Sequence, residues 1–139
     1  MENPGTGRRP LLPAIARYVM GVPLLVFGLN FFLNFIPQPK TVMAPGAAAF
    51  LAALLATGYM MRLIGFTFVL VGGFLVSNRF VPLAIALFAP FVVNSILFHV
   101  FLERTGLPMS AVLLGLEIFL AWSYRKSFSG LLAARAAPC

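Results

Sequence analysis

The chain has 139 residues, of which 61% are hydrophobic and only 9% are charged. A soluble domain of this length carries a far larger charged fraction, so the composition indicates a single polytopic membrane domain. The formal net charge of +7 does not predict nucleic-acid binding, because most basic residues lie in short segments beside apolar runs, where they fit anionic lipid headgroups.

The chain begins with a predicted tail and a predicted membrane helix. Residues 1–10 are polar, contain several Pro and Gly, and are expected to be disordered. Residues 12–35 form an apolar run long enough to span a bilayer, and no small-residue cleavage site follows it, so we expect a retained helix. Asn30 and Asn34 share one face of this helix, either as interhelical hydrogen-bonding groups or as part of a ligand pocket.

The next segment predicts a loop, a short helix and a second span. Three prolines between residues 36 and 46 indicate a loop. Residues 47–77 are too many for one span and too few for two, so we predict a short interfacial or re-entrant helix at 47–56 and a membrane helix at 59–77. Arg62 then lies near the membrane interface, where a guanidinium can reach the headgroups.

Two further spans are predicted at residues 81–101 and 109–124, which gives a four-helix domain at 11–128 and a C-terminal tail at 129–139. In the third span Ser95, His99 and Glu103 are spaced by four residues and form one polar stripe, with Asn94 one step round the helix. A polar stripe inside a membrane has to face protein, water or a ligand.

The basic residues predict the orientation. With four spans both termini lie on the same side, and that side carries most of the Arg and Lys, including Arg79, Arg125 and Lys126. The positive-inside rule therefore places both termini in the cytoplasm, in a membrane of the bacterial cytoplasmic type.

This topology places six polar residues in the outward half of the spans and predicts one polar pocket there, covered by the short helix. The six are Asn30, Asn34, Arg62, Asn94, His99 and Glu103. Glu117 lies deeper, where a charged carboxylate costs about 2.5–3.5 kcal/mol or more. We therefore expect Glu117 to be protonated, or paired with Arg62, Asn94 or Tyr124. It is either a packing residue or a site for a proton or a headgroup.

The sequence contains no catalytic motif. His99 is either a satisfied interface residue or a proton acceptor for a quinol, since histidine titrates near physiological pH. One cysteine, one histidine and three acidic residues offer too few ligands for a metal centre, and none is expected.

Several motifs resemble the DoxX-like family of small four-helix membrane proteins. They are LNFF and FIPQP near the end of the first span, ALLATGYM before the second, NRFVPLAIALFAPFVVNSILFH over the third, and AWSYRKSF after the fourth. The resemblance implies a subunit or partner of a membrane redox system, such as thiosulfate:quinone oxidoreductase, or a cargo receptor or assembly chaperone as in distant relatives. Asn94 and His99 match the family's third-helix Asn and His, and Asn30 matches the end of its first helix.

The chain departs from the family in its second span. An acidic residue usually precedes the glycine there, but this chain has no charge in the segment from Gly65 to Phe68. A function that depends on this carboxylate elsewhere in the family is therefore either absent here or moved to Glu117.

The predicted function is a non-catalytic subunit or binding module of a quinone-linked membrane system, with a quinone or lipid as ligand. Its expected partners are the bilayer, a membrane or peripheral redox protein, and other copies of the chain in a homo-oligomer, but no nucleic acid. The alternatives are an oxidoreductase subunit that uses His99 and Glu117 for protons, a small transporter, or a membrane chaperone.

Overall fold

The computed structural model describes residues 11–37 and 40–131 and is helical, as predicted. The predicted tail at 1–10 and the C-terminal residues from 132 onward lie outside the described part. The helices are α1 (Leu11–Leu33), α2 (Pro45–Ala56), α3 (Met60–Ser77), α4 (Val81–Phe101) and α5 (Leu107–Ser123), with short 3-10 turns at Arg104–Gly106 and Arg125–Phe128.

Four of these helical segments are long and apolar enough to cross a membrane: α1, α3, α4 and Arg104–Ser123, which includes α5. This confirms the predicted four spans with a short helix before the second. Three boundaries differ from the prediction by two residues, one of them the start of the short helix, which begins at Pro45 rather than at residue 47. The first span ends at Leu33, because Asn34 adopts a left-handed backbone with φ of 49°. The last helix begins before Pro108, which occupies the first turn, where a proline removes no helical hydrogen bond.

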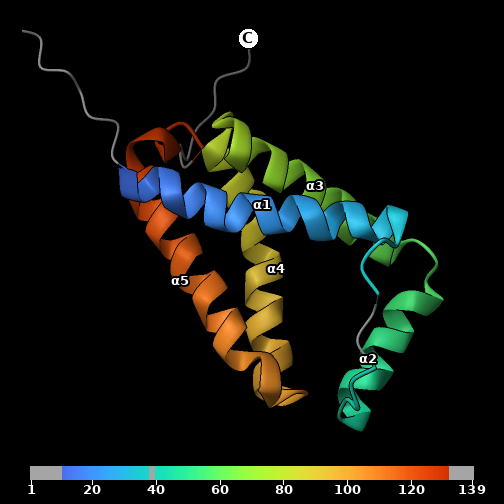
Figure 1. The fold of residues 1–139 in the computed structure, drawn as a ribbon. Helices are drawn as coiled ribbons and strands as arrows, with labels where there is room; N and C mark the ends of the chain where they lie inside the picture. The colour runs from blue at the N-terminus through green and yellow to red at the C-terminus, as the bar shows by residue number, and fades with distance from the viewer. Residues whose placement is uncertain (1–10, 38–39, 132–139) are drawn as a thin grey trace, which may run out of the picture.

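Glycines bring α1 and α3 into backbone contact. The two helices run antiparallel, with Gly21 and Gly28 of α1 facing α3 and Gly65 and Gly72 of α3 facing α1 (Figure 1). A Cβ atom added at Gly72 would lie 2.8 Å from both the Gly21 carbonyl oxygen and the Leu25 backbone nitrogen. Because these four glycines have no Cβ atom, the two helices can approach each other closely, as at the small-residue interfaces of other membrane helices.

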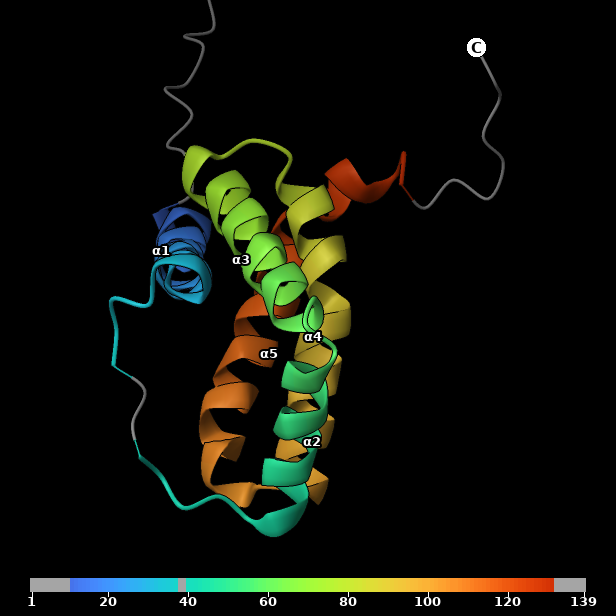
Figure 2. The ribbon, with the colours of Figure 1, turned by 90° about the vertical axis from the view of Figure 1, so that its right-hand side faces the viewer.

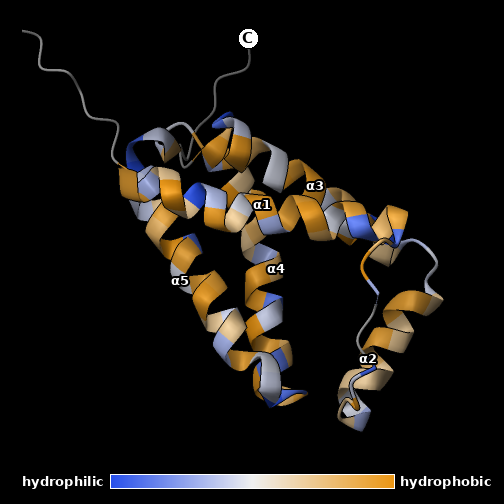
Figure 3. Cartoon of the chain, viewed as in Figure 1, coloured by the Kyte–Doolittle hydropathy of each residue, from blue (hydrophilic) through white to orange (hydrophobic). Residues whose placement is uncertain are grey.

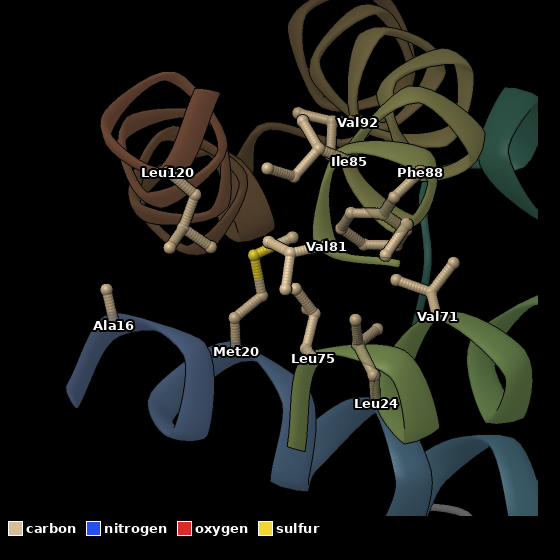
Figure 4. Packing of buried hydrophobic residues seen from close by; sticks show 11 residues of the cluster. Ala16, Met20, Leu24, Val71, Leu75, Val81, Ile85, Phe88, Val92 and Leu120 are labelled. Carbon is tan, nitrogen blue, oxygen red and sulfur yellow. The ribbon is translucent and has the colours of Figure 1, made fainter. Parts of the chain in front are cut away.

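The second pair, α4 and α5, lies across the first. Figures 1 and 2 show α4 and α5 running side by side and crossing the direction of α1 steeply. Ser95 of α4 and Ser110 of α5 hydrogen-bond through their Oγ atoms at 3.0 Å. A buried apolar cluster joins all four spans near this crossing (Figure 4), with members Ala16, Met20, Leu24, Val71, Leu75, Val81, Ala84, Ile85, Phe88, Val92 and Leu120.

The outer surface of the helices is apolar. Large side chains such as Val19, Leu63 and Ile118 are more than half exposed. Figure 3 shows hydrophobic colours along the helices and hydrophilic colours mainly at their ends. Water does not favour so much exposed apolar surface on a monomer, whereas lipid does. The protein is therefore an integral membrane protein whose helices contact lipid.

Arg17 is a buried residue whose position the sequence pattern did not reveal. A basic residue at the start of a span usually marks the edge of the membrane. The Arg17 side chain, however, is only 6% exposed, and its Nη1 donates a hydrogen bond of 2.9 Å to the Leu75 carbonyl oxygen. Leu75 lies in the last turn of α3, where its carbonyl oxygen also accepts a hydrogen bond of 3.3 Å from the Asn78 backbone N–H. The C-terminal end of a helix attracts positive charge. Arg17 thus fastens the end of α3 to the start of α1.

Candidate functional site: a pocket between α1, α2 and α3

A large hollow lies where α2 faces the C-terminal end of α1 and the start of α3. Its volume is about 640 Å³, within the usual range for small-molecule sites. Its walls are mostly aromatic and aliphatic, and are formed by Phe27, Asn30, Phe31, Asn34, Ile36, Pro37, Leu51, Leu55, Met61 and Phe68. The hollow can therefore hold an apolar molecule of moderate size that carries a small polar group.

Asn30 supplies the buried polar group of this pocket. Its side chain is 6% exposed, and its Oδ1 accepts a hydrogen bond of 2.7 Å from the Ile36 backbone N–H. This bond fixes which end of the amide carries oxygen and leaves the two Nδ2 donors for other partners. It also folds the chain back over the end of α1. Of the two alternatives for Asn30, the described residues show no interhelical hydrogen bond, because the partner of Oδ1 belongs to the segment that follows the same helix. Asn30 does line the pocket.

Asn34 lines the same pocket from its edge. It is exposed, and its left-handed backbone turns the chain from α1 toward Ile36 and Pro37. Asparagine tolerates this conformation better than most residues. The pocket thus combines two amides with an apolar interior, an arrangement that suits hydrogen bonding to a carbonyl or hydroxyl at the head of an otherwise apolar ligand.

α2 forms one side of the pocket through Leu51 and Leu55. Its opposite edge contacts α4, where the rings of Phe50 and Phe98 lie 5.5 Å apart between centroids. The N-terminal end of α2 is held by Glu103, whose Oε2 accepts a hydrogen bond of 2.8 Å from the Ala44 backbone N–H. α2 therefore forms a wall of this hollow, which differs in its lining from the polar pocket that the sequence predicts beneath the short helix.

The predicted single polar pocket is wrong, because the six outward polar residues separate into different environments. Asn30 and Asn34 line the large pocket. Asn94 lines a smaller hollow of about 260 Å³ between α2 and α4. Arg62 is exposed in the first turn of α3 and lines neither hollow. The steep crossing of the helix pairs explains the separation, because it directs the ends of α1 and α4 apart (Figure 1).

His99 and Glu103 are part of a turn at the end of α4 rather than of a pocket. His99 Nδ1 lies 2.8 Å from the Glu103 carbonyl oxygen, so Nδ1 carries the hydrogen of this bond. The imidazole also packs against Gly106, where even a methyl group would overlap the ring. With Ser95 bonded to Ser110, the predicted polar stripe does face protein. Among the described residues, this stripe joins α4 to α5 and to the turn that follows α4.

Glu117 is buried in α5 without a partner. Its side chain is 6% exposed, and neither carboxyl oxygen has a hydrogen-bond partner among the described residues. Of the two expectations for Glu117, the described residues do not show the pairing with Arg62, Asn94 or Tyr124, and the expected protonation stays a prediction. Tyr124 instead directs its hydroxyl to the Asn78 side chain at 3.4 Å. Glu117 lies ten residues beyond Leu107, or roughly 15 Å along α5 from the turn that contacts His99.

No protein-family model, curated protein or solved structure matches this chain. The resemblance to the DoxX-like family stays a prediction from the motifs. The aromatic lining of the pocket was only partly visible in the sequence, where Phe27 shares a face with the two asparagines. Phe68, Leu51 and Leu55 come from other helices, and no spacing pattern within one helix connects them to that face.

The bond between Glu103 and Ala44 predicts a pH-dependent attachment of α2. The Ala44 backbone N–H, and after it the Thr105 hydroxyl at 2.9 Å, lower the pKa of Glu103. A lowered pKa means that this stabilisation is complete above the ordinary glutamate range and is lost as the pH falls below about 4, through the lowered value. Hydrogen exchange at the Ala44 amide, corrected for the intrinsic rate, is expected to accelerate in that range.

Glu103→Gln is the matched control for this measurement. The glutamine keeps an acceptor oxygen for Ala44 but does not titrate, so the corrected exchange rate should become independent of pH. Equal acid acceleration in the wild-type and Gln proteins would show that another group controls this end of α2.

Proposed function

We propose that this protein is a membrane-embedded binding module that holds a lipid-like or quinone-like molecule in the pocket between α1, α2 and α3. The observation that carries the proposal is the combination of an aromatic, lipid-compatible interior with a buried amide whose nitrogen has no hydrogen-bond partner among the described residues. A quinone ring or an ester-linked headgroup offers carbonyl oxygens to such donors, and its tail suits the apolar walls.

The proposal also covers the partner of the protein, its membrane and the side on which its termini lie. The motifs shared with DoxX-like proteins favour a role beside a membrane redox partner. The start of α1, the end of α5 and the turn between α3 and α4 lie at the same end of the molecule (Figure 1). Arg79 belongs to that turn, and Arg125 and Lys126 follow α5. This distribution supports cytoplasmic termini in a bacterial-type membrane, because basic residues favour the cytoplasmic face.

The oxidoreductase alternative receives less support from the geometry. It requires His99 and Glu117 to exchange protons with one bound quinone. His99 is engaged with the Glu103 carbonyl group and with Gly106, and Glu117 lies roughly 15 Å further along α5. Neither residue lines the large pocket. A direct proton path between the two would need groups that the described residues do not place there.

The test uses a bulky substitution inside the pocket and a matched one outside it. Leu51→Trp adds an indole to the pocket wall, whereas Ala52→Trp adds the same group at the next, exposed position of α2. Decylubiquinone and a brominated phosphatidylglycerol serve as probes, and native mass spectrometry of gently extracted protein detects endogenous ligand. We expect the wild-type and Ala52→Trp proteins to bind one probe and Leu51→Trp to bind it at least about tenfold more weakly, a loss of about 1.4 kcal/mol.

Two results would contradict the proposal. In the first, the wild-type protein retains no ligand and binds neither probe beyond ordinary partitioning into the membrane. In the second, Leu51→Trp folds and binds as well as the wild-type protein, which would place binding elsewhere.

A further inference from the structure

One face of α4 is exposed along the whole length of the helix. Leu83, Leu87, Pro90, Asn94, Leu97 and Phe101 are all exposed, and their spacing alternates between four and three residues. This is the spacing of the seam residues in helices that pack on a second helix with a left-handed crossing. We call these six residues the α4 seam.

Asn94 is the single polar side chain of the α4 seam. It lies seven residues before Phe101, so it is roughly 10 Å along the helix from its end and deep within the apolar span. Its neighbours Ser95 and His99 have hydrogen-bond partners on the protein side. No corresponding bond joins the Asn94 amide to the residues that the structure describes. Asn94 is exposed at the edge of the hollow between α2 and α4, whose other lining residues have apolar side chains. The surrounding lipid offers no hydrogen-bonding group to an amide at this depth.

We propose that the α4 seam is the interface between two copies of this chain, related by a twofold axis that passes close to Asn94. An asparagine side chain carries both donors and an acceptor, so the same residue in a second copy supplies what the first one lacks. A single asparagine at a seam position also fixes register and the number of helices in packed helix assemblies. The seam contains no charged residue, so pairing brings no like charges together.

The surface beside Asn94 has room for a partner side chain. Phe50 of α2, Leu97 and Phe101 surround the hollow of about 260 Å³ that Asn94 also lines. Packing between membrane helices depends on such complementary hollows, because lipid already solvates apolar side chains as well as a neighbouring helix does. This interface is independent of the pocket between α1, α2 and α3, and either inference can fail without the other.

The experiment places single cysteines in the full chain, with Cys139 replaced by Ser. Leu97→Cys reports on the α4 seam, and Val22→Cys on the exposed face of α1 is the matched control, since both residues are close to half exposed. Each variant is oxidised in native membranes and in vesicles of phosphatidylglycerol and phosphatidylethanolamine at low protein density. We expect a disulfide-linked dimer from Leu97→Cys and little from Val22→Cys.

Asn94→Ala tests the role of the amide. Two reciprocal hydrogen bonds are lost, so the dimer is expected to dissociate roughly tenfold more readily, as measured by counting fluorophores per vesicle across a dilution series. Asn94→Gln retains the amide and should restore most of the association. Thermal unfolding of the monomer should be the same for Asn94→Ala and wild type, because the residue is exposed.

Three outcomes would overturn the proposal. They are equal crosslinking at Leu97→Cys and Val22→Cys, a wild-type protein that is monomeric at every density, and an Asn94→Ala protein that associates as strongly as wild type. Crosslinks from Leu97→Cys to other proteins in native membranes, without self-crosslinks in vesicles, would replace the second copy by a different partner.

Discussion

Gly72→Ala is expected to lower the free energy of unfolding by about 3 kcal/mol, the upper end of the usual cost of overpacking. The added methyl group would lie 2.8 Å from two backbone atoms of α1, and neither atom can move without shifting the whole helix. The loss occurs even though alanine favours helix formation more than glycine does. Circular dichroism during titration with a denaturing detergent measures the change.

Gly73→Ala is the control, because it makes the same chemical change one residue further along α3. A Cβ atom at Gly73 meets nothing within 4 Å, so only the gain in helix propensity remains, and stability should stay equal or rise by up to about 1 kcal/mol. If both variants unfold at the same detergent concentration, the backbone contact between α1 and α3 does not determine stability.

Glu117→Met is expected to raise the free energy of unfolding by about 1–3 kcal/mol. Both carboxyl oxygens of Glu117 are buried without a partner among the described residues, and an unsatisfied buried polar group costs about this much. Methionine has a similar length and is flexible enough to fill the same space without a polar group. Thermal unfolding of the purified protein in mild detergent, compared with wild type, measures the gain.

Glu117→Gln is the control that keeps a polar side chain of the same shape at this position. Glutamine has nearly the same shape but leaves an unpartnered amide in the same place, so its stability should remain close to that of wild type. A Met variant that is less stable than the Gln variant would indicate that Glu117 has a partner in the membrane-embedded protein, such as a lipid or a bound ligand.

The four spans and the short helix were predictable because they depend on the length and composition of apolar runs. The predicted span at 81–101 coincides with α4, and the one at 59–77 differs from α3 by one residue. The end of α1 was placed two residues too late, because Asn34 ends the helix through a left-handed backbone rather than through a proline. Hydropathy alone does not report such a change of conformation.

The candidate pocket was only partly predictable. Asn30 and Asn34 line a hollow beside the short helix, but they were grouped with Asn94, His99 and Glu103 because all five lie in the same half of their spans. That grouping assumes nearly parallel helices. Here the two helix pairs cross steeply (Figure 2), so residues at equal depth in different helices lie far apart around the molecule.

Arg17 and the glycines between α1 and α3 show a second limit of prediction from the sequence. The sequence indicates that a glycine permits close approach, but not which helix approaches it. Gly72 and Gly73 are adjacent in the sequence, yet only Gly72 meets α1. Similarly, an arginine at the start of a span indicates orientation, while its hydrogen bond to the Leu75 carbonyl group depends on where α3 ends.

The contacts that Gly21, Gly28, Gly65 and Gly72 form between α1 and α3 also limit how the protein can move. Because backbone atoms of the two helices meet at Gly21, Gly28 and Gly72, sliding one helix along the other would force one helix backbone past the other. α1 and α3 should therefore move together as one rigid body. A displacement of α1 and α3 at the pocket would therefore also displace their other ends, near Arg17. Local opening would occur at α2, because α2 has few contacts with the rest of the chain.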